Sequence, residues 1–413
     1  MTAVSPAPPA CPNCAQPTTS IGTAEPWCPA CEWNLEIPAS VGWGWLDRRL
    51  YAVATRLTTG QFKALAEGPL TPRRTTTARV ATLAAAVVLL AGVLAIFGLG
   101  VWLVLYDFFN VSTVLGLVLI AIAVALRPRL PRLPDDVIVL DPARTPALNG
   151  LVQRVASAVG APAPTILLLG YDLNASTRSV GLKRERALRI GLPLWATLEP
   201  QERVALLGHE MGHFVNGDVR RGLLTQMSKT TLDKVADLFD TRTRGEGPVE
   251  FLIAIATTLI GWTVSRIAMA LQLLLYWISQ RDSQRAEYLA DELAARAGGS
   301  AAAIGLFDHL LLHLPIDTVM RREARAGNGP DAWLAAARIA RANQAANVPA
   351  LRRLSRRTEV SLFASHPPTA LRAEMLERRP RQAAAVTLTE AESARIDAEL
   401  ATPAKRVRVA LTE

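Results

Sequence analysis

Five consecutive residues have the types and spacing that chemistry needs: His209-Glu210-Met211-Gly212-His213. On a helix, two histidines four positions apart share one face, so both rings can hold one zinc ion beside a glutamate that acts as general base. The chain has only five histidines, so this arrangement is improbable as a coincidence. The alternative is a buried helix whose histidines are satisfied without a metal. The motif therefore predicts a catalytic zinc site.

A catalytic zinc ion usually takes three protein ligands and leaves one position for water. Glu287 is the best candidate for the third ligand, because Glu287 and Asp291 lie one turn apart on one helix face. One carboxylate can bind zinc while the other accepts a hydrogen bond from a ligand histidine. The same spacing also suits a solvated acidic face. His309 and His313 are four apart without an acid between them, so we expect half-buried helix residues there rather than a second metal site.

All four cysteines precede residue 32, as Cys11, Cys14, Cys28 and Cys31. Two Cys-x-x-Cys pairs separated by 13 residues suit a tetrahedral four-thiolate zinc ion. Such a site is closed, so it is structural and not catalytic. Two disulfides or a redox pair are the alternatives, although no βαβ pattern lies nearby to support redox chemistry. Thiolates of this kind favour a reducing compartment and a cytosolic N-terminus.

The composition favours a membrane over nucleic acid as a partner. Half of the 413 residues are hydrophobic, and the formal net charge is +9. The arginines are dispersed or flank apolar runs, without the basic and aromatic platform of single-strand binders, so we expect no nucleic-acid partner. Basic residues beside apolar runs instead suit an anionic leaflet. The first 40 residues, rich in proline and cysteine, do not resemble a cleavable signal peptide.

Two uncharged runs follow each other, over 80–106 and 108–126, with 27 and 19 residues. About 20 apolar residues suffice to cross a bilayer as a helix. We therefore predict a transmembrane helical hairpin within residues 73–132, with a buried soluble helix pair as the alternative. Arginines on both flanks place both ends of the hairpin on the cytoplasmic side.

A third apolar stretch covers residues 251–279. Its 29 residues are too few for two crossings of about 20 residues each. If the two motif histidines and Glu287 bind one ion, the chain between them must return to the same side of the membrane. We therefore expect this stretch to dip into the bilayer or to pack on the first hairpin.

The remaining pattern predicts a mainly α fold with a small mixed β-sheet. Strands are expected over 137–140, 165–169 and 186–191, and helices over 43–67 and 145–159. The first of these helices is amphipathic and suits either the membrane surface or a linker. Pro200 and the acids around it predict the start of the motif helix. Most of the chain after residue 300 has a helical pattern.

At this point the sequence resembles a known family, the HtpX-like membrane zinc metalloproteases, which are relatives of the CAAX prenyl proteases. Four elements carry the resemblance, in the order that the family has them between residues 137 and 378. They are Leu173-Asn174-Ala175, His-Glu-Met-Gly-His-Phe-Val-Asn-Gly-Asp over 209–218, Glu287-Tyr288-Leu289-Ala290-Asp291, and Ser365-His366-Pro367-Pro368-Thr369. Residues 1–70 lie outside it.

The resemblance implies a gluzincin endopeptidase. In the family pattern His209, His213 and Glu287 would hold the zinc ion, and Glu210 would be the base. Asp291 would lie behind these ligands and orient a histidine.

The other two elements concern substrate. The resemblance places Asn174 and Ala175 on an edge strand that pairs with substrate backbone. It brings His366 towards the site, where it would stabilise the oxyanion; the alternative is that His366 only ends a loop.

Together these features predict five segments. They are a zinc ribbon (1–40), an amphipathic helix with linker (41–72), the transmembrane hairpin (73–132), a zinc metalloprotease domain that includes 251–279 (133–380), and a C-terminal tail (381–413). Two zinc ions are expected per chain, one catalytic and one structural.

The predicted function is that of a membrane-bound zinc endopeptidase. We expect it in the plasma membrane, with its N-terminus and catalytic domain cytoplasmic, cleaving misfolded or damaged membrane proteins. Processing of lipidated peptides, as in the CAAX branch, is an alternative that would need more apolar segments than this chain has. An inactive membrane-tethered adaptor that recruits a partner through the ribbon is another.

Overall fold

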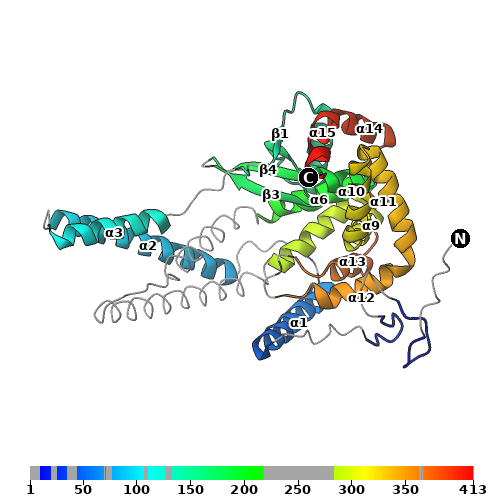
Figure 1. The fold of residues 1–413 in the computed structure, drawn as a ribbon, viewed down its shortest axis with the longest axis horizontal. Helices are drawn as coiled ribbons and strands as arrows, with labels where there is room; N and C mark the ends of the chain where they lie inside the picture. Colours follow the sequence, from blue (N-terminus) through cyan, green and yellow to red (C-terminus); the bar gives the residue numbers. More distant parts are fainter. Residues whose placement is uncertain are drawn as a thin grey trace.

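Helices form most of the described part of the chain and pack beside one small sheet (Figure 1). This computed structural model describes residues 10–19, 26–34, 44–68, 70, 77–106, 110–126, 133–134, 136–181, 183–217, 283–361, 364 and 366–412. The apolar stretch 251–279 therefore lies outside the described residues. Within them, the predicted class, mainly α with a small mixed sheet, is confirmed.

The sheet has four strands in the order β1-β2-β4-β3. They are β1 (Ile138–Leu140), β2 (Ile166–Gly170), β3 (Ala175–Val180) and β4 (Glu185–Gly191). β2 and β4 run parallel, and the two outer strands are antiparallel to their neighbours. The three strands expected over 137–140, 165–169 and 186–191 are confirmed as β1, β2 and β4. The polar strand β3 forms one edge of the sheet.

Two helices carry the centre of the fold, α4 (Pro146–Val159) and α6 (Pro200–Asn216). α4 ends where Gly160 adopts a left-handed φ of 71°, as the sequence predicted. α6 begins with a reciprocal cap, in which the backbone N–H of Glu199 donates to the side chain of Glu202 at 3.1 Å. Short α5 (Leu192–Thr197), which the sequence did not predict, connects β4 to α6.

The second half of the described chain is helical throughout. A helix over 283–298 is followed by α9 (Ser300–Leu311), α10 (His313–Arg325), α11 (Pro330–Gln344), the 3-10 turn η1 (Ala345–Asn347), α12 (Val348–Thr358), α13 (Thr369–Glu377), α14 (Glu390–Glu399) and α15 (Ala401–Ala410).

The C-terminal residues, expected as a tail, form part of the main core. Ile396 and Leu400 of α14 and Val407 of α15 pack with α4, α6 and the sheet. Arg203 of α6 is 1% exposed and donates to Asp397 at 2.8 Å. α14 and α15 therefore help to fix the motif helix.

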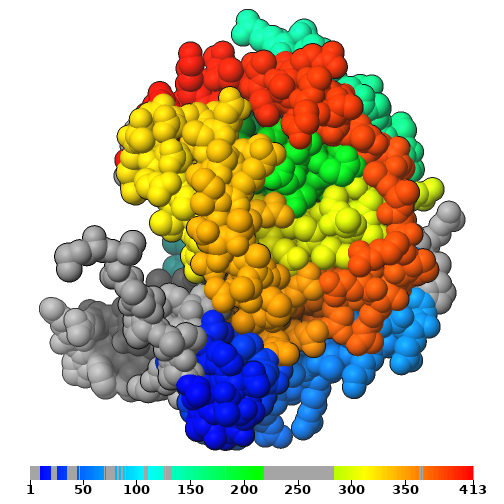
Figure 2. All heavy atoms as spheres, turned by 90° about the vertical axis from the view of Figure 1, so that its right-hand side faces the viewer, coloured from blue at the N-terminus to red at the C-terminus, as the bar shows by residue number. Residues whose placement is uncertain are grey.

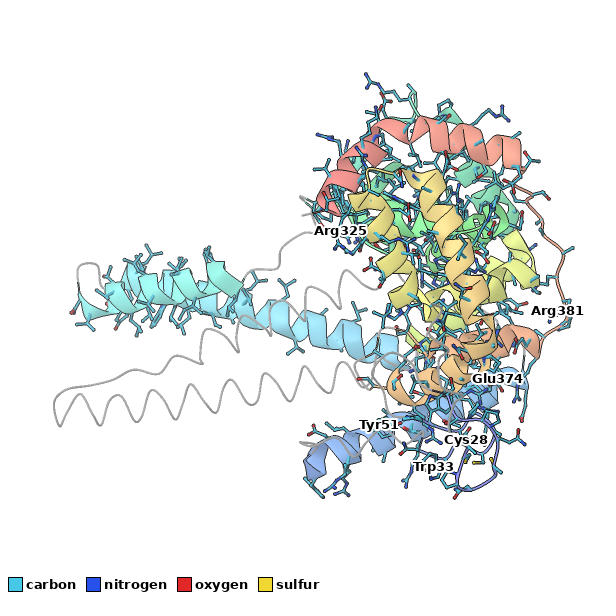
Figure 3. The ribbon with its side chains drawn as sticks, turned by 45° about the vertical axis from the view of Figure 1, so that its right-hand side comes forward. Cys28, Trp33, Tyr51, Arg325, Glu374 and Arg381 are labelled. Carbon is cyan, nitrogen blue, oxygen red and sulfur yellow. The ribbon has the colours of Figure 1, made fainter. Side chains whose placement is uncertain are left out.

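The two apolar helices α2 (Thr77–Tyr106) and α3 (Val111–Leu126) pack side by side and project from the rest of the molecule (Figures 1 and 3). They approach closely at Gly100 and Gly116, where a Cβ on Gly100 would lie 2.8 Å from the Gly116 carbonyl oxygen. Large apolar side chains remain exposed along both: Val87, Val88, Leu94, Phe97, Trp102, Val114, Leu117 and Val118.

Among the described residues, no single helix is both long and apolar enough to cross a membrane. The apolar helical stretches there, Leu90–Tyr106 and Val111–Val124, are shorter. The helices α9 and α10 have the length and composition of a span only when taken together, and they are bent by 77° relative to each other.

The amphipathic helix α1 (Trp45–Ala66) packs on the protein core. Phe62 and Leu65 on α1 contact Tyr288, next to Glu287, and Leu371 and Met375 of α13. α1 is thus more than a linker, because it contacts the helix that carries Glu287 and helix α13.

Candidate metal centre

The motif helix α6 brings its three acidic and imidazole side chains together. His209 Nε2 lies 3.2 Å from His213 Nε2, and ligand atoms of His209, Glu210 and His213 all lie within 4.8 Å of one another. His209 and Glu210 are buried, and His213 is partly exposed. One helix therefore presents two imidazoles and a carboxylate to one point.

The helix over 283–298 supplies Glu287 at the same point. Its Oε2 lies 3.6 Å from His209 Nε2, and its Oε1 lies 3.7 Å from His213 Nε2. Ligand atoms about 2.1 Å from a tetrahedral zinc ion lie about 3.4 Å apart, so these separations suit zinc. Oε2 of Glu210 is buried without a hydrogen-bond partner among the described residues. Such an orphaned oxygen suits a group that awaits water or substrate.

The two helices reach this distance because small residues line their contact. A Cβ on Gly212 would lie 2.7 Å from the Cα of Ala290, and one on Gly208 would lie 2.7 Å from the Cβ of Ala297. The backbones of the two helices are therefore in contact, and this close packing brings the Glu287 carboxylate to the two histidines. The glycine inside the motif has this packing role.

Replacing Gly212 by alanine should lower the free energy of unfolding by about 1–3 kcal/mol, because the new methyl group overpacks the contact with Ala290. Zinc affinity should fall as well, since Glu287 would move away from His213. Denaturant unfolding and zinc titration measure the two effects. Gly150→Ala on α4 is the control, because a Cβ there meets no atom within 4 Å. Equal stability of both variants would contradict the packing argument.

The histidines keep Glu287 ionised. Burial alone would raise the pKa of Glu287, but His366, His213 and His209 hold it well below its usual range. His366 is closest, with Nδ1 2.6 Å from Glu287 Oε2. An ionised carboxylate is the form that binds a metal.

Asp291 orients His209 from behind. The carboxylate is fully buried, and its Oδ1 lies 2.9 Å from His209 Nδ1. Donation of Nδ1–H to Asp291 leaves the Nε2 lone pair facing Glu287 and His213. Glu287 and Asp291 are both buried, so they do not form a solvated acidic face, and the role of Glu287 as a zinc ligand stays a prediction.

Arg372 of α13 is a site residue that the sequence analysis missed. Its Nε and Nη2 donate to Asp291 at 2.9 and 2.6 Å, and Nη2 also lies 3.2 Å from His209 Nδ1. The guanidinium stacks over the ring of Phe307 at 4.5 Å and keeps the pKa of buried Asp291 below its usual range. One arginine among many on an Ala/Arg-rich helix gave no local signal.

The residues expected near substrate lie beside the motif helix. β3 contacts α6, and Ala175 is the first residue of this edge strand. Asn174 accepts from the backbone N–H of Gly191 through its carbonyl oxygen at 2.7 Å, which fixes the start of the edge. His366 is half-exposed, so it reaches Glu287 from the solvent side.

The four cysteines form a second cluster far along the chain from the first. Cys11 Sγ lies 3.5 Å from Cys31 Sγ, Cys14 Sγ lies 3.4 Å from Cys28 Sγ, and all four are free thiols. Sulfur atoms about 2.3 Å from a tetrahedral zinc ion lie about 3.8 Å apart, so the cluster suits zinc.

The two cysteine pairs have the same backbone turn. Cys11 N–H donates to the Gln16 carbonyl and Cys28 N–H donates to the Trp33 carbonyl, at 2.8 and 2.9 Å. The residue four positions after each first cysteine, Ala15 or Glu32, has φ near 60° (57° and 61°). A repeated turn that accepts a strained φ twice is typical of a four-thiolate metal knuckle.

His309 and His313 do not converge. His309 is buried rather than half-buried, with Nε2 3.2 Å from Thr197 Oγ1, and burial lowers its pKa to about 3. His313 is exposed, and its Nδ1 lies 3.1 Å from the Leu310 carbonyl oxygen.

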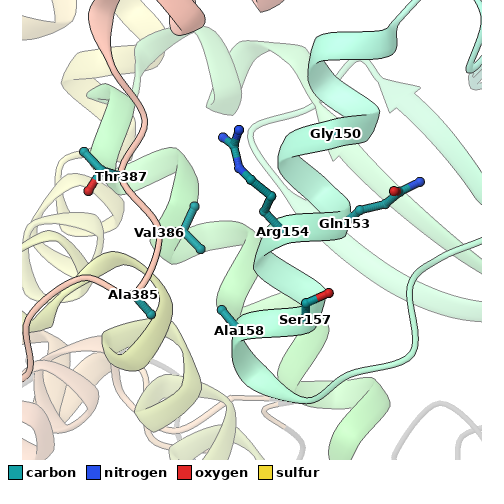
Figure 4. Close-up of a pocket in the computed structure, with 8 residues that line it drawn as sticks. All are labelled: Gly150, Gln153, Arg154, Ser157, Ala158, Ala385, Val386 and Thr387. Carbon is teal, nitrogen blue, oxygen red and sulfur yellow. The ribbon is translucent and has the colours of Figure 1, made fainter.

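A shallow groove of about 720 Å³ lies between α4 and residues 385–387 (Figure 4). Its one charged lining residue, Arg154, is paired with Glu392 at 2.6 Å. The groove holds no further group suited to catalysis among the residues that line it.

Two histidines and a glutamate on one helix, with a carboxylate from a second helix beside a sheet edge, have the arrangement of the zinc metallopeptidase class. The model of peptidase family M48 matches residues 142–380, more than half of the chain. The chain therefore belongs to peptidase family M48, and the predicted resemblance to HtpX-like proteases is confirmed.

Curated relatives agree with this assignment. Protease HtpX of Pseudomonas syringae pv. syringae is 26% identical over 242 residues, which cover 55% of this chain and 70% of the relative. Protease HtpX of Pseudomonas putida is 29% identical over 195 residues, 43% of this chain and 61% of the relative. Protease HtpX homolog 1 of Sulfurisphaera tokodaii is 23% identical over 173 residues, 40% and 56%.

The chain spans about half the length of the archaeal relatives that it matches. No solved structure matches it. The matched family region excludes the cysteine cluster, α1 and the apolar hairpin.

Proposed function

We propose that the protein is a membrane-bound zinc endopeptidase that cleaves misfolded or damaged membrane proteins on the cytoplasmic side. The observation that carries the proposal is the convergence of His209, His213 and Glu287, with donor atoms 3.2–3.7 Å apart. Glu210 lies beside them with an orphaned oxygen. These three residues would hold the catalytic ion, and Glu210 would be the base.

The bound zinc ion supplies Lewis-acid polarisation of the scissile carbonyl and makes water a better nucleophile. Glu210 takes a proton from the attacking water and passes it to the leaving amine. Asp291, itself held by Arg372, would keep His209 in one orientation throughout. His366, half-exposed and beside Glu287, would donate a hydrogen bond to the oxyanion.

The substrate would add a strand to the sheet. β3 is an edge strand in contact with α6, so a peptide paired with it passes the metal centre. Pairing through backbone atoms tolerates many side-chain sequences, which suits substrates recognised by their unfolded state.

The hairpin α2–α3 supports the membrane part of the proposal. Large apolar side chains cover its outward faces, and Gly100 and Gly116 bring its helices into backbone contact, as small residues do inside bilayers. Arginines before and after the hairpin sequence favour a cytoplasmic position for both ends, and with them the catalytic residues.

We expect two zinc ions per purified chain, one on the cysteines and one on the motif site. A chelator should stop cleavage of casein, and added zinc should restore it, because no side chain at either proposed site can take over the role of the ion. Metal analysis of the wild type, Cys14→Ser and His213→Gln measures the assignment, and each variant should lose one ion. If the wild type holds one zinc ion and His213→Gln still holds it, the motif site binds no zinc. That result would contradict the proposed catalytic centre and favour the inactive adaptor.

A further inference from the structure

The cysteine cluster is seated on α12. We call residues 10–19 and 26–34 the ribbon. Trp27 of the ribbon is 3% exposed and packs on Ala350 and Leu354 of α12. Glu32 forms an ion pair with Arg357 at 2.6 Å, and Thr19 Oγ1 donates to Asn347 Oδ1 at 3.3 Å. Figures 2 and 3 show this segment lying against the orange helices.

α12 in turn holds the first turn of α13. The backbone N–H of Ala370 donates to Ser355 Oγ at 3.1 Å, and that of Thr369 donates to Glu359 Oε2 at 2.7 Å. These N–H groups are ones that an α-helix leaves without intrahelical partners. Ser355 lies on α12, and Glu359 directly follows the end of α12. These two residues therefore fix where α13 begins.

α13 and the segment before it carry two groups of the metal centre. Arg372 lies two positions after Ala370, donates to Asp291, and has its Nη2 3.2 Å from His209 Nδ1. His366 lies between α12 and α13 and bonds Glu287. A shift of α12 would therefore move both groups relative to His209 and Glu287.

The ribbon itself depends on its metal. Its described part has two isolated β-bridges as its sheet structure, and its buried hydrophobic side chains are those of Cys11, Trp27 and Cys28. The burial of so few apolar side chains does not offset the conformational entropy lost when this small unit folds. Without an ion, the four thiolates would also lose the geometry that holds the two turns together. We therefore expect the contact between the ribbon and α12 to require the bound ion.

We propose that the ribbon zinc is a positioning device for the catalytic centre. With the ion bound, the ribbon packs on α12 and fixes its position. α12 then holds α13 so that Arg372 contacts Asp291 and His366 contacts Glu287. Loss of the ion releases α12 and slows turnover, while the catalytic ion stays in place. This inference rests on the proposed peptidase function, but its structural part is independent of that function.

The experiment compares three variants of the full-length protein. Cys14→Ser removes the ribbon ion, and Trp27→Ala keeps the ion while removing the contact with Ala350 and Leu354. Glu392→Gln serves as the control. It breaks the ion pair between Glu392 and Arg154, which is as short, at 2.6 Å, as the pair between Glu32 and Arg357 but lies away from α12 and α13. Zinc content, hydrogen exchange and the kcat and KM of casein cleavage are measured for each.

Cys14→Ser should retain one zinc ion, and Trp27→Ala should retain two. Both should show faster exchange in α12 and α13 but unchanged exchange in α4 and α14. Their kcat should fall on the order of tenfold with KM nearly unchanged, because misplacement of positioning groups by less than 1 Å costs up to about 10²-fold. Trp27→Phe should recover most of the loss, and Glu392→Gln should match the wild type.

Unchanged exchange in α12 and α13 after loss of the ribbon ion would overturn the proposal, as would an unchanged kcat. Faster exchange over the whole fold would also overturn it, since that is the result of a merely stabilising ribbon. If Cys14→Ser does not fold, Trp27→Ala and Glu32→Gln decide through the same readouts. If the wild type cleaves nothing, the proposed function fails, and the exchange data alone decide whether the ribbon positions α13.

Discussion

Replacing Glu210 by glutamine should leave both zinc ions bound and lower kcat for casein cleavage by about 10²- to 10⁴-fold, the range that general acid–base catalysis contributes. The amide has the shape of the carboxylate but cannot take a proton from water. Glu210 lies beside the proposed ligands, and its Oε2 has no hydrogen-bond partner among the described residues, so few structural contacts are lost. Metal analysis and cleavage rates measure the two effects together.

Glu390→Gln, at an exposed position at the start of α14, is the control for the same change of charge. It should retain wild-type kcat. Wild-type activity in Glu210→Gln would refute the assignment of Glu210 as the base. Loss of the motif-site ion in that variant would instead show that the carboxylate helps to hold the metal.

Replacing Arg372 by methionine should lower the free energy of unfolding by about 3–5 kcal/mol, because it leaves the buried charge of Asp291 without its partner. The two guanidinium bonds to Asp291 are 2.9 and 2.6 Å long, and Asp291 is 0% exposed. His209 also loses the neighbour that keeps Asp291 in line with its ring. Denaturant unfolding measures the loss of stability, and the zinc affinity of the motif site should fall with it.

Two comparisons test the reason. Arg378→Met, which breaks an exposed pair with Glu374 next to the same helix, should cost at most about 1 kcal/mol. The double variant Arg372→Met with Asp291→Leu should recover much of the stability, since both charges are then absent. A loss in Arg372→Met no larger than that in Arg378→Met would contradict a buried, mutually dependent pair.

Local signals in the sequence predicted much of the fold around the site. Apolar runs predicted β1 and β2, the pattern over 186–191 predicted β4, the pattern over 145–159 predicted α4, and Pro200 with its acids predicted the start of α6. Each of these depends on residues within a few positions of one another. β3 has no such signal, because Ala-Ser-Thr-Arg-Ser-Val does not alternate; pairing with β4 makes it a strand.

Long-range packing decided the roles of the chain ends. Residues 381–413 gave helical patterns, but only the core contacts of Ile396 and Val407 make them part of the central fold. The cysteine spacing predicted that the four thiols cluster, whereas the contact of this segment with α12 depends on Trp27 packing on Ala350 and Leu354. No spacing within the first 40 residues predicts that contact.

The sequence by itself determined which residue types could form a metal centre: the helical spacing puts His209 and His213 on one face, and the cysteine spacing puts four thiols in reach of one ion. The sequence also indicated Glu287 as the third ligand, but only the tertiary structure brought Glu287 and Arg372 from two other helices to these histidines. Glu287 reaches the histidines because Gly212 lets α6 touch Ala290 of the second helix, and Arg372 reaches Asp291 because α12 fixes the start of α13. Spacing acts within a helix, whereas contacts between helices depend on shape and burial along the whole chain.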